Sequence, residues 1–525
     1  MDFLCRGRGA FRARCGSRED TPDTEVVVIG NGPAGLAVSA FLSGIHPYYD
    51  SLRGHPDDEV HRRLTRLEQS SLIDQDLSWY EQKMMEQADR AMGYLYDTLA
   101  RPSIDAGIHR PSALRWVADA SRAVPHVVLG ATAPGGSWST HDPEYPSTTV
   151  LLNSRWWLYL SAVCSIFPAT QWQPGWRIRR APARGTVGRS GQIESWTDLF
   201  SEQPASVVAA YMREYPRRVG ISARVRSGTT VTKLEKTPSG MWRVSGVQAA
   251  SGRPFTLLTR RVVLATGLMQ QRMLEVDGEE GNARIVYTMQ QLKQKMGEIT
   301  DPTAPSVSSS PSPSSSSPPV IVVGDGISAA DAVLFCMERG LRVMHVMRKN
   351  EHELRRSAAR LRSRFSASLY PEYYNVFELM QGRQQHALYE RRVAVRVEKI
   401  DVQRVMLRTR NGVKEESFSL LAACIGQRTT FDGVLPGGDQ SSSPRFSFGR
   451  DYRAEEDPSL FCVGSAVGDH YVRFLVGGCM HVAQQIVAEH EGGRNLVLDT
   501  VDEDTVIPPQ EAFLDGDDGL LEISC

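Results

Sequence analysis

The fold is decided by the stretch Glu25-Val-Val-Val-Ile-Gly-Asn-Gly-Pro-Ala-Gly35. Its four apolar residues, 26–29, predict a strand that is buried on both faces, as in a parallel sheet. Glycines follow at once as Gly30-x-Gly32-x-x-Gly35, and the apolar run 36–42 predicts a helix that ends near Gly44. In a dinucleotide-binding turn of this pattern, the first glycine permits the tight turn and the second admits the pyrophosphate. The third lets the helix pack closely on the strand.

The same pattern of strand, turn and helix occurs a second time. It is found in Val320-Ile-Val-Val-Gly-Asp-Gly-Ile-Ser-Ala329, which places Gly324, Gly326 and Ala329 at the three turn positions. One glycine turn alone also fits an ordinary connection between strand and helix. Two copies in one chain predict an α/β protein with two dinucleotide-binding domains, which passes a hydride from one nucleotide to the other.

The composition agrees with a globular protein of more than one domain. The 525 residues exceed what one hydrophobic core holds, and the 41% hydrophobic and 23% charged fractions are typical of soluble proteins. A net charge of −1 gives no general attraction to nucleic acid or to an anionic membrane. The sequence has no apolar run of about 18 residues, so no transmembrane helix is predicted.

The two ends of the chain differ in charge. Residues 1–23 are rich in arginine and are predicted to be a disordered basic tail, with a mitochondrial presequence as the alternative. Residues 493–525 are predicted to be a solvated acidic tail. The eight cysteines show no CxxC or metal-like spacing, which favours a reducing compartment, free thiols and no structural metal. A cytoplasmic protein is expected, and a disulfide reductase with a close cysteine pair is not.

The order of the motifs predicts that one nucleotide domain is inserted in the other. The first domain is expected to begin with residues 24–300, which include a helical insertion at about 45–125, and to finish with residues 416–492. The second domain is expected at residues 320–415. Residues 301–319 are predicted to be a linker, because nine Ser and six Pro among residues 302–319 cannot bury a core.

The first unit lacks the acidic residue that usually binds a ribose. A compact unit places this acid about 20 residues after the first glycine, at the end of its second strand. Asp50 stands at that distance, but residues 46–54 do not have the pattern of a strand. The better second strand is 126–129, after the insertion, and it ends in Gly130 without an acid.

Basic residues end the corresponding strand of the second unit. The strand predicted at residues 341–347 is followed by Arg348 and Lys349. A cation there favours the 2′-phosphate of NADP, so NADPH is the expected nicotinamide nucleotide. The alternative is that Arg348 is a solvated charge at a strand end.

Four further segments are expected near the nucleotides. Pro134-Gly-Gly-Ser-Trp138 combines glycines that would admit a cofactor with an apolar wall, although a surface turn with a buried tryptophan has the same pattern. Buried strands that close on glycines are predicted at 262–267, 420–426 and 459–464.

These segments resemble those of a known group of enzymes. The glycine turns 30–35 and 324–329, the motifs 135–138 and 265–267, and Gly468-Asp469 occur in the order seen in flavin-containing and Baeyer–Villiger monooxygenases. Longer stretches resemble the oxidative stress-induced growth inhibitor family more closely, and the resemblance covers about residues 24–490 apart from the Ser/Pro segment. They are Ile29-Gly-Asn-Gly-Pro33, Ser71-Leu-Ile-Asp-Gln-Asp-Leu77, Pro125-His-Val-Val-Leu-Gly130, Leu369-Tyr-Pro-Glu-Tyr373 and Gly468-Asp-His-Tyr-Val-Arg-Phe-Leu475.

The resemblance implies a two-domain flavoprotein with FAD in the first unit and NADPH in the second. The implied FAD residues are Gly30, Asn31, Gly32, Gly35, Gly136, Ser137, Trp138 and Asp469. Asp469 would bind the ribityl chain, or it would only cap a helix. The implied NADPH residues are Gly324, Gly326, Ala329 and Arg348.

The implied reaction is oxygenation of a small molecule by NADPH and O2, with neither a metal nor a nucleophilic side chain. The sequence departs from the monooxygenase pattern, because Tyr287 stands where an FxGxxxH-type motif has histidine. Asn153 is the candidate for a catalytic asparagine near the flavin, or it is a plain asparagine at a strand end. The alternatives are a catalytically weak regulator of growth and cell death that acts through protein partners, and an oxidase that releases peroxide.

Overall fold

The computed structural model describes most of the expected nucleotide-binding regions. The described residues are 21–85, 90–108, 110–139, 205–268, 270–300, 317–364, 371–429, 431, 434–435, 446–470 and 472–492. Asn153, most of the Ser/Pro segment and almost all of both predicted tails lie outside them.

The first sheet is built around the strand predicted from residues 26–29. This strand, β1 (Thr24–Ile29), pairs in parallel with β4 on one side and with β8 on the other. The pairing of Val26–Ile29 with His126–Leu129 confirms that the second strand follows the insertion. The sheet has the order β5-β4-β1-β8-β7-β6, with β19 parallel to the end of β8. Its other strands are β4 (His126–Leu129), β5 (Val225–Arg226), β6 (Thr229–Lys236), β7 (Trp242–Gln248), β8 (Pro254–Leu264) and β19 (Leu460–Cys462).

The second sheet is parallel throughout and has the order β10-β17-β11-β12-β13. Its strands are β10 (Ile285–Val286), β11 (Val320–Val323), β12 (Val343–Met347), β13 (Tyr389–Val393) and β17 (Leu421–Ala423). The assignment of residues 420–426 to the first unit is wrong, because β17 lies between β10 and β11. A short apolar run indicates a buried strand but carries no information about its neighbours.

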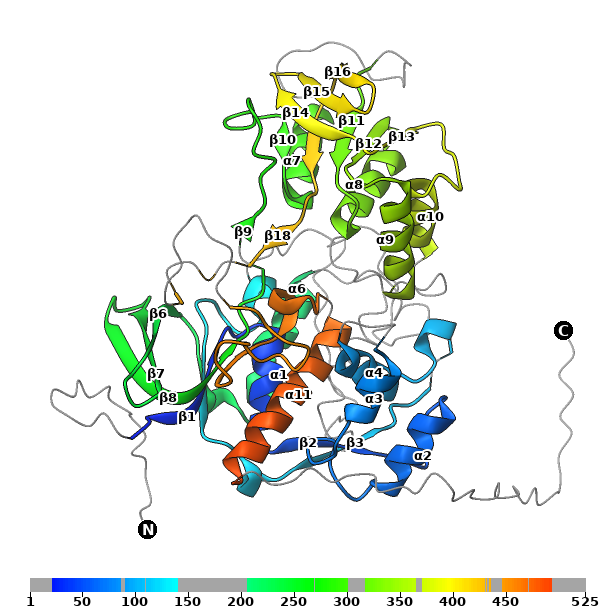
Figure 1. The fold of residues 1–525 in the computed structure, drawn as a ribbon. Coiled ribbons are helices and arrows are strands. Elements are labelled where there is room, and N and C mark those ends of the chain that lie inside the picture. The colour runs from blue at the N-terminus through cyan, green and yellow to red at the C-terminus, as the bar shows by residue number, and fades with distance from the viewer. Residues whose placement is uncertain are drawn as a thin grey trace, which may run out of the picture.

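A small antiparallel sheet lies beside the second sheet, and two short strands connect the first sheet to the second (Figure 1). The small sheet consists of β14 (Arg396–Ile400), β15 (Arg404–Thr409) and β16 (Gly412–Ser417). The chain leaves the first sheet through β9 (Gln270–Gln271) and returns through β18 (Gln427–Arg428), and these strands pair with each other. Figure 1 shows the two large sheets in separate regions with β9 and β18 between them.

The predicted insertion contains helices and one additional pair of strands. Residues 46–54 were not expected to form a strand, yet β2 (Ile45–Tyr49) pairs with β3 (Leu114–Ala118) in an antiparallel ribbon. Pro47 inside β2 weakens the strand pattern, and such a proline is tolerated in a short ribbon but not in a central strand. Because β2 is not part of the first sheet, Asp50 does not end its second strand. The helices are α2 (Asp58–Arg66), α3 (Ser78–Lys83) and α4 (Ala91–Ala100).

Helices α1 (Pro33–Leu42) and α11 (Val472–His490) form the layer beside the first sheet. Helix α1 begins after Gly32 with a proline in its first turn, and Gly44 just beyond its end has the left-handed φ of +82° that the sequence predicts. All residues from Ala34 to Leu42 are buried, because α11 covers the side of α1 that the sheet does not.

The other helices of the described residues lie around the two sheets. They are α6 (Ala205–Val219), α7 (Met289–Thr300), α8 (Ile327–Glu338), α9 (Glu351–Arg364) and α10 (Pro371–Met380). Short 3-10 helices are η1 (Ile104–Ala106), η2 (Ala120–Arg122), η3 (Gly136–Ser139), η6 (Ser222–Arg224) and η7 (Gly464–Val467). Within the described ranges, no helix is both long and apolar enough to cross a bilayer, and no group of His, Cys, Asp or Glu is arranged to hold a metal ion.

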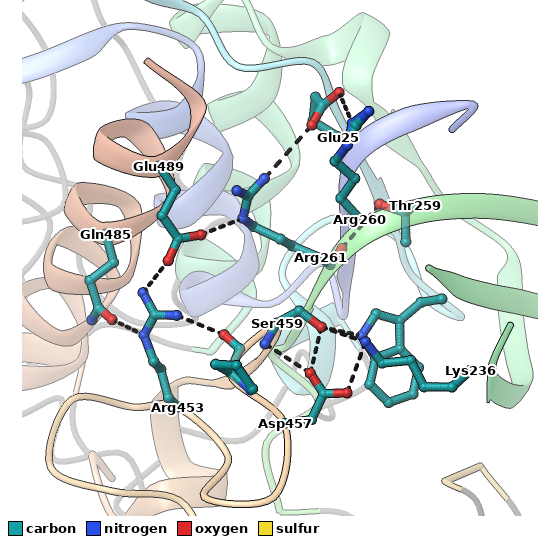
Figure 2. A network of polar contacts seen from close by, with 12 residues as sticks. Glu25, Lys236, Thr259, Arg260, Arg261, Arg453, Asp457, Ser459, Gln485 and Glu489 are labelled. Carbon is teal, nitrogen blue, oxygen red and sulfur yellow. Dashed lines mark hydrogen bonds and ion pairs between the residues drawn. The ribbon is translucent and has the colours of Figure 1, made fainter. Parts of the chain in front are cut away.

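A polar network fastens the end of α11 to the first sheet. Glu489 accepts hydrogen bonds from Arg261 of β8 and from Arg453, and Arg453 also donates to Gln485 (Figure 2). Arg260 and Arg261 both contact Glu25 in β1. Since Glu25 lies at the opposite end of β1 from Gly30, this network stabilises the fold rather than the glycine turn.

Buried histidines should make the fold sensitive to acid. Burial lowers the pKa of His46, His126, His345 and His481 to about 4. The unfolded chain, with ordinary pKa values near 6.5, therefore binds more protons, and stability falls as the pH is lowered from about 6.5 toward 4. We expect the thermal midpoint to drop across this window in a pH series of melting curves. A midpoint that is constant from pH 6.5 to 4.5 would contradict the burial of these rings.

Candidate functional site

The first glycine turn needs glycine at its outer positions for reasons of packing alone. Gly30 has a φ of +113°, and a Cβ there would lie 2.2 Å from the carbonyl oxygen of Ala265. A Cβ on Gly35 would lie 1.9 Å from the carbonyl oxygen of Gly30. The predicted roles of these residues, a tight turn and close packing of helix and strand, are therefore confirmed.

The middle glycine, Gly32, is different, because neither its backbone conformation nor the packing around it requires glycine. Gly32 has a φ of −73°, which any residue adopts, and the atoms nearest to its added Cβ are 3.9 Å away. The space in front of Gly32 lies at the N-terminus of α1, where unpaired N–H groups favour an anion. The turn therefore has the N–H donors that a pyrophosphate needs, and no packing contact of the protein accounts for glycine at position 32.

The structure brings the Gly-Gly-x-Trp motif against this turn. The N–H of Gly135 donates to the carbonyl oxygen of Asn31 at 2.8 Å, and a Cβ on Gly136 would lie 2.9 Å from Cα of Gly32. Ser137 is exposed and Trp138 is half-buried against the core. The motif thus lies against the first glycine turn.

Asn31 explains why an acid is missing from the end of β4. Its side chain is buried, and Nδ2 donates to the carbonyl oxygen of Thr132 at 2.7 Å. A Cβ on Gly130 would lie 2.0 Å from Cγ of Asn31, so a side chain at position 130 would collide with it. Asn31 therefore joins two parts of the protein through its side chain, and only its backbone lies in the turn.

Asp469 lies at the same end of the first sheet as the glycine turn. It follows η7, where Gly464 contacts Ala34 in the first turn of α1, and its side chain is 7% exposed. The hydroxyl of Tyr452 donates to Oδ2 of Asp469 at 2.9 Å. Because α11 begins at Val472, Asp469 is not in the position of its N-cap, which disfavours the capping alternative. No motif in the sequence indicated Tyr452, because its contact with Asp469 depends on the tertiary structure.

The second glycine turn repeats the geometry of the first. Gly324 has a φ of +133°, and a Cβ there would lie 2.1 Å from the carbonyl oxygen of Cys424, which corresponds to Ala265 at the first turn. Gly326 has no neighbouring atom within 4 Å of its added Cβ, and its φ of −97° is open to any residue. Ala329 is fully buried, as the packing position requires.

A buried histidine, His345, forms a hydrogen bond to the second glycine turn. Nε2 of His345 lies 2.7 Å from the carbonyl oxygen of Gly324, and Nδ1 lies 2.9 Å from the hydroxyl of Tyr389. A carbonyl oxygen only accepts, so Nε2 carries the proton and Nδ1 accepts from the tyrosine. Burial lowers the pKa of His345 to about 4, so the ring is neutral near pH 7 and holds the turn in place.

Two basic residues end β12 next to this turn. Arg348 is exposed, and Nζ of Lys349 contacts Asp325 at 2.6 Å and Ser357 at 2.6 Å. Because β12 runs parallel to β11, both strands end at the same edge of the sheet. Lys349, which was not among the predicted site residues, is therefore tied directly to the turn.

Tyr287 serves a structural purpose at the end of β10. Its hydroxyl donates to Oε1 of Glu279 at 2.6 Å, and Glu279 also accepts from the backbone N–H groups of Leu274 and Glu275. Burial and the neighbouring Glu279 raise the pKa of Tyr287 above its ordinary value. This tyrosine stays neutral and fastens a loop.

Comparisons with curated proteins find similarity over nearly the whole chain. The chain is 34% identical over 469 residues to an oxidative stress induced growth inhibitor homolog of Caenorhabditis elegans, which covers 88% of this chain and 94% of that protein. It is 28% identical over 499 residues to mouse oxidative stress-induced growth inhibitor 1, with 88% and 95% covered. No protein-family model matches the chain.

Similarity to solved structures is weaker. Bacillithiol disulfide reductase from Bacillus cereus has a TM-score of 0.46 at 14% identity, with 89% of this chain and 99% of that chain covered. Ornithine hydroxylase from Pseudomonas aeruginosa has a TM-score of 0.44 at 12% identity, with 89% and 99% covered. The cadaverine monooxygenase DfoA of Erwinia amylovora, solved with FAD, has a TM-score of 0.45 at 12% identity, with 94% and 99% covered.

Proposed function

Because the chain belongs to the oxidative stress-induced growth inhibitor family, we propose that it is a flavoprotein that binds FAD at Gly30–Gly35 and NADPH at Gly324–Ala329. One observation carries this proposal. Gly30, Gly35 and Gly324 are required by the packing of the protein, whereas an added Cβ would make only ordinary contacts at 3.9 Å at Gly32 and would meet nothing within 4 Å at Gly326, each at the start of a helix. A bound pyrophosphate supplies the reason for glycine at these two positions.

The residues around the first turn fit FAD. The N–H groups at the start of α1 would bind the pyrophosphate, and Gly136 would border it. The carboxylate of Asp469 would accept a hydrogen bond from a hydroxyl of the ribityl chain. When bound, FAD supplies the chemistry of accepting a hydride from NADPH and passing electrons to oxygen. The protein's part is to hold both nucleotides and to exclude water.

The second nucleotide unit is larger than the motifs alone predict. We place it at about residues 272–426, between the connecting strands β9 and β18, because β10 and β17 both belong to the second sheet. Arg348 and Lys349 would bind the 2′-phosphate of NADPH at the edge where β11 and β12 end. The proposed reaction is an FAD- and NADPH-dependent oxygenation of a small molecule.

An absorption spectrum tests this proposal. Protein purified under mild conditions should be yellow, bleach when NADPH is added without oxygen, and regain colour as oxygen is admitted. NADPH consumption that depends on an added substrate supports a monooxygenase. Equal amounts of NADPH consumed and peroxide formed without substrate would instead identify an oxidase.

A second candidate is a regulator of growth that acts through protein partners with little turnover. The close approach of Asn31 to Gly130 favours it, because it leaves no room for an acidic side chain at the end of β4, the usual source of the carboxylate that binds the ribose. Protein that carries no FAD and takes up no oxygen with NADPH would support this candidate.

Arg348→Ala should change the choice between the two nicotinamide nucleotides. Loss of one charged contact to the 2′-phosphate costs about 1.5–3 kcal/mol, so the Kd for NADPH should rise about tenfold or more and that for NADH should stay nearly constant. Arg342→Ala, an exposed arginine before the other end of the same strand, is the matched control and should leave both values unchanged. Equal losses for both nucleotides on Arg348→Ala would refute the 2′-phosphate role.

A further inference from the structure

Tyr452 is a buried tyrosine directly beside Asp469. Its side chain is 1% exposed, its φ is +69°, and its hydroxyl donates to Oδ2 of Asp469 at 2.9 Å. A non-glycine residue with positive φ stores strain that the surroundings must hold. Gly478 of α11 leaves room for the ring, since a Cβ there would lie 2.5 Å from the tyrosine hydroxyl. The phenol ring of Tyr452 thus packs directly against α11 at Gly478.

Arg90, a residue of the insertion, packs on the ring of Tyr452. Its guanidinium lies over the ring of Tyr452, with Cζ 4.4 Å from the ring centre. The same group donates to the carbonyl oxygen of Gly449 at 2.7 Å and to that of Val467 at 3.0 Å. One side chain therefore joins the loop that carries Tyr452 to the segment that ends in Asp469.

Helix α4, which begins directly after Arg90, is fixed against α11. A Cβ on Gly477 would lie 2.0 Å from the carbonyl oxygen of Met92, and a Cβ on Gly93 would lie 2.7 Å from that of Phe474. Arg473 of α11 pairs with the buried Asp97 of α4. This close crossing keeps the backbone of Arg90 at a fixed place relative to Asp469.

We propose that the insertion at about residues 45–125 is a positioning device for the flavin site, in which Arg90 holds Tyr452 and Tyr452 orients the carboxylate of Asp469 toward the ribityl chain. This inference rests on the proposed function, because it concerns the same FAD site. The hydroxyl fixes one carboxylate oxygen, so the side chain does not have to be ordered when the flavin binds. Burial and the neighbouring Asp469 raise the pKa of Tyr452, so its hydroxyl remains a donor near pH 7.

Tyr452→Phe removes only the hydroxyl and should weaken FAD binding about fivefold to tenfold, which is the effect expected for one hydrogen bond. Affinity is measured by titrating apoprotein with FAD and following quenching of the flavin fluorescence. Tyr49→Phe is the matched control, because Tyr49 is another buried tyrosine of the insertion, whose hydroxyl lies 2.7 Å from Nδ1 of His61. It should leave the affinity unchanged.

A double-mutant cycle separates positioning from a general effect on the fold. In an Asp469→Ala background, Tyr452→Phe should have little further effect, since Asp469→Ala already removes the carboxylate that accepts from the hydroxyl. If the two losses of FAD affinity were additive, the positioning role of Tyr452 would be wrong. The proposal that the protein binds FAD would still hold. A wild-type apoprotein that binds no FAD would overturn both this inference and the proposed function.

Arg90→Lys tests the same chain of contacts without altering Tyr452. Lysine keeps the charge but loses the planar fork that reaches two carbonyl oxygens. We expect FAD binding to weaken about threefold or more, together with a changed visible circular dichroism of the bound flavin. An unchanged affinity and an unchanged spectrum would contradict the role of the insertion.

Discussion

Gly32→Val is expected to give a folded protein that has lost its flavin. The backbone at Gly32 has a φ of −73°, and the nearest atoms to an added Cβ are 3.9 Å away, so the fold admits a Cβ at this position. Valine is a poor N-cap and costs about 1 kcal/mol of stability. Its methyl groups would fill the space that a pyrophosphate needs, so FAD affinity should fall about 100-fold or more, which corresponds to roughly 3 kcal/mol.

The matched control for this variant is Gly326→Val at the second turn. It should keep the yellow colour but lose reduction by NADPH, because the second nucleotide alone is excluded. Gly35→Val should instead prevent folding, since its Cβ would lie 1.9 Å from the carbonyl oxygen of Gly30. Flavin content, NADPH-dependent bleaching and thermal melting separate the three outcomes. Retained flavin in Gly32→Val would count decisively against the placement of FAD.

Asp97→Ala is expected to cause a large loss of stability in a protein that still folds. Asp97 is 2% exposed and pairs with both Arg101 and Arg473, and the side chain of Arg473 is equally buried. Removing the carboxylate leaves buried positive charge without its partner, which costs about 3–5 kcal/mol. The denaturant concentration at the midpoint of unfolding should be clearly lower than for the wild type, because α4 and α11 lose the ion pair that joins them.

Asp105→Ala is the control for this loss, because Asp105 contacts the same Arg473 but its side chain is 46% exposed. An exposed pair contributes about 1 kcal/mol or less.

The pH dependence of stability gives a second check on the role of Asp97. Burial acts to raise the pKa of Asp97, but Arg101 and Arg473 hold it below its ordinary value. Its stabilisation is therefore complete above the unfolded pKa near 4 and is lost as the pH falls through the lower folded value. Equal destabilisation by Asp97→Ala and Asp105→Ala would contradict this account.

The contacts of α4 also change how the insertion is understood. The sequence shows only a helical segment that interrupts the first nucleotide unit. In the folded protein, Arg90 and Asp97 of this segment contact the loop before Asp469 and the helix after it. The insertion is therefore part of the structure around the proposed flavin site.

Sequence alone determined the features whose causes are local. The strand 26–29, its glycine turn and the start of α1 follow from apolar patterning, positive φ and a proline in the first helical turn, all within about 15 residues. The second turn at Gly324 follows for the same reasons. The match to the family was also contained in the sequence, because its longer stretches are specific.

Only the tertiary structure decided which strands are neighbours and which polar groups meet. The short strand β17 has no feature that selects β11 over β8, since sheet pairing is set by the packing of the whole chain. The close approach of Asn31 to Gly130 and the contact between Tyr452 and Asp469 join loops that are ordered by different strands. Backbone preferences act over a few residues, whereas these contacts exist only after distant segments have packed together.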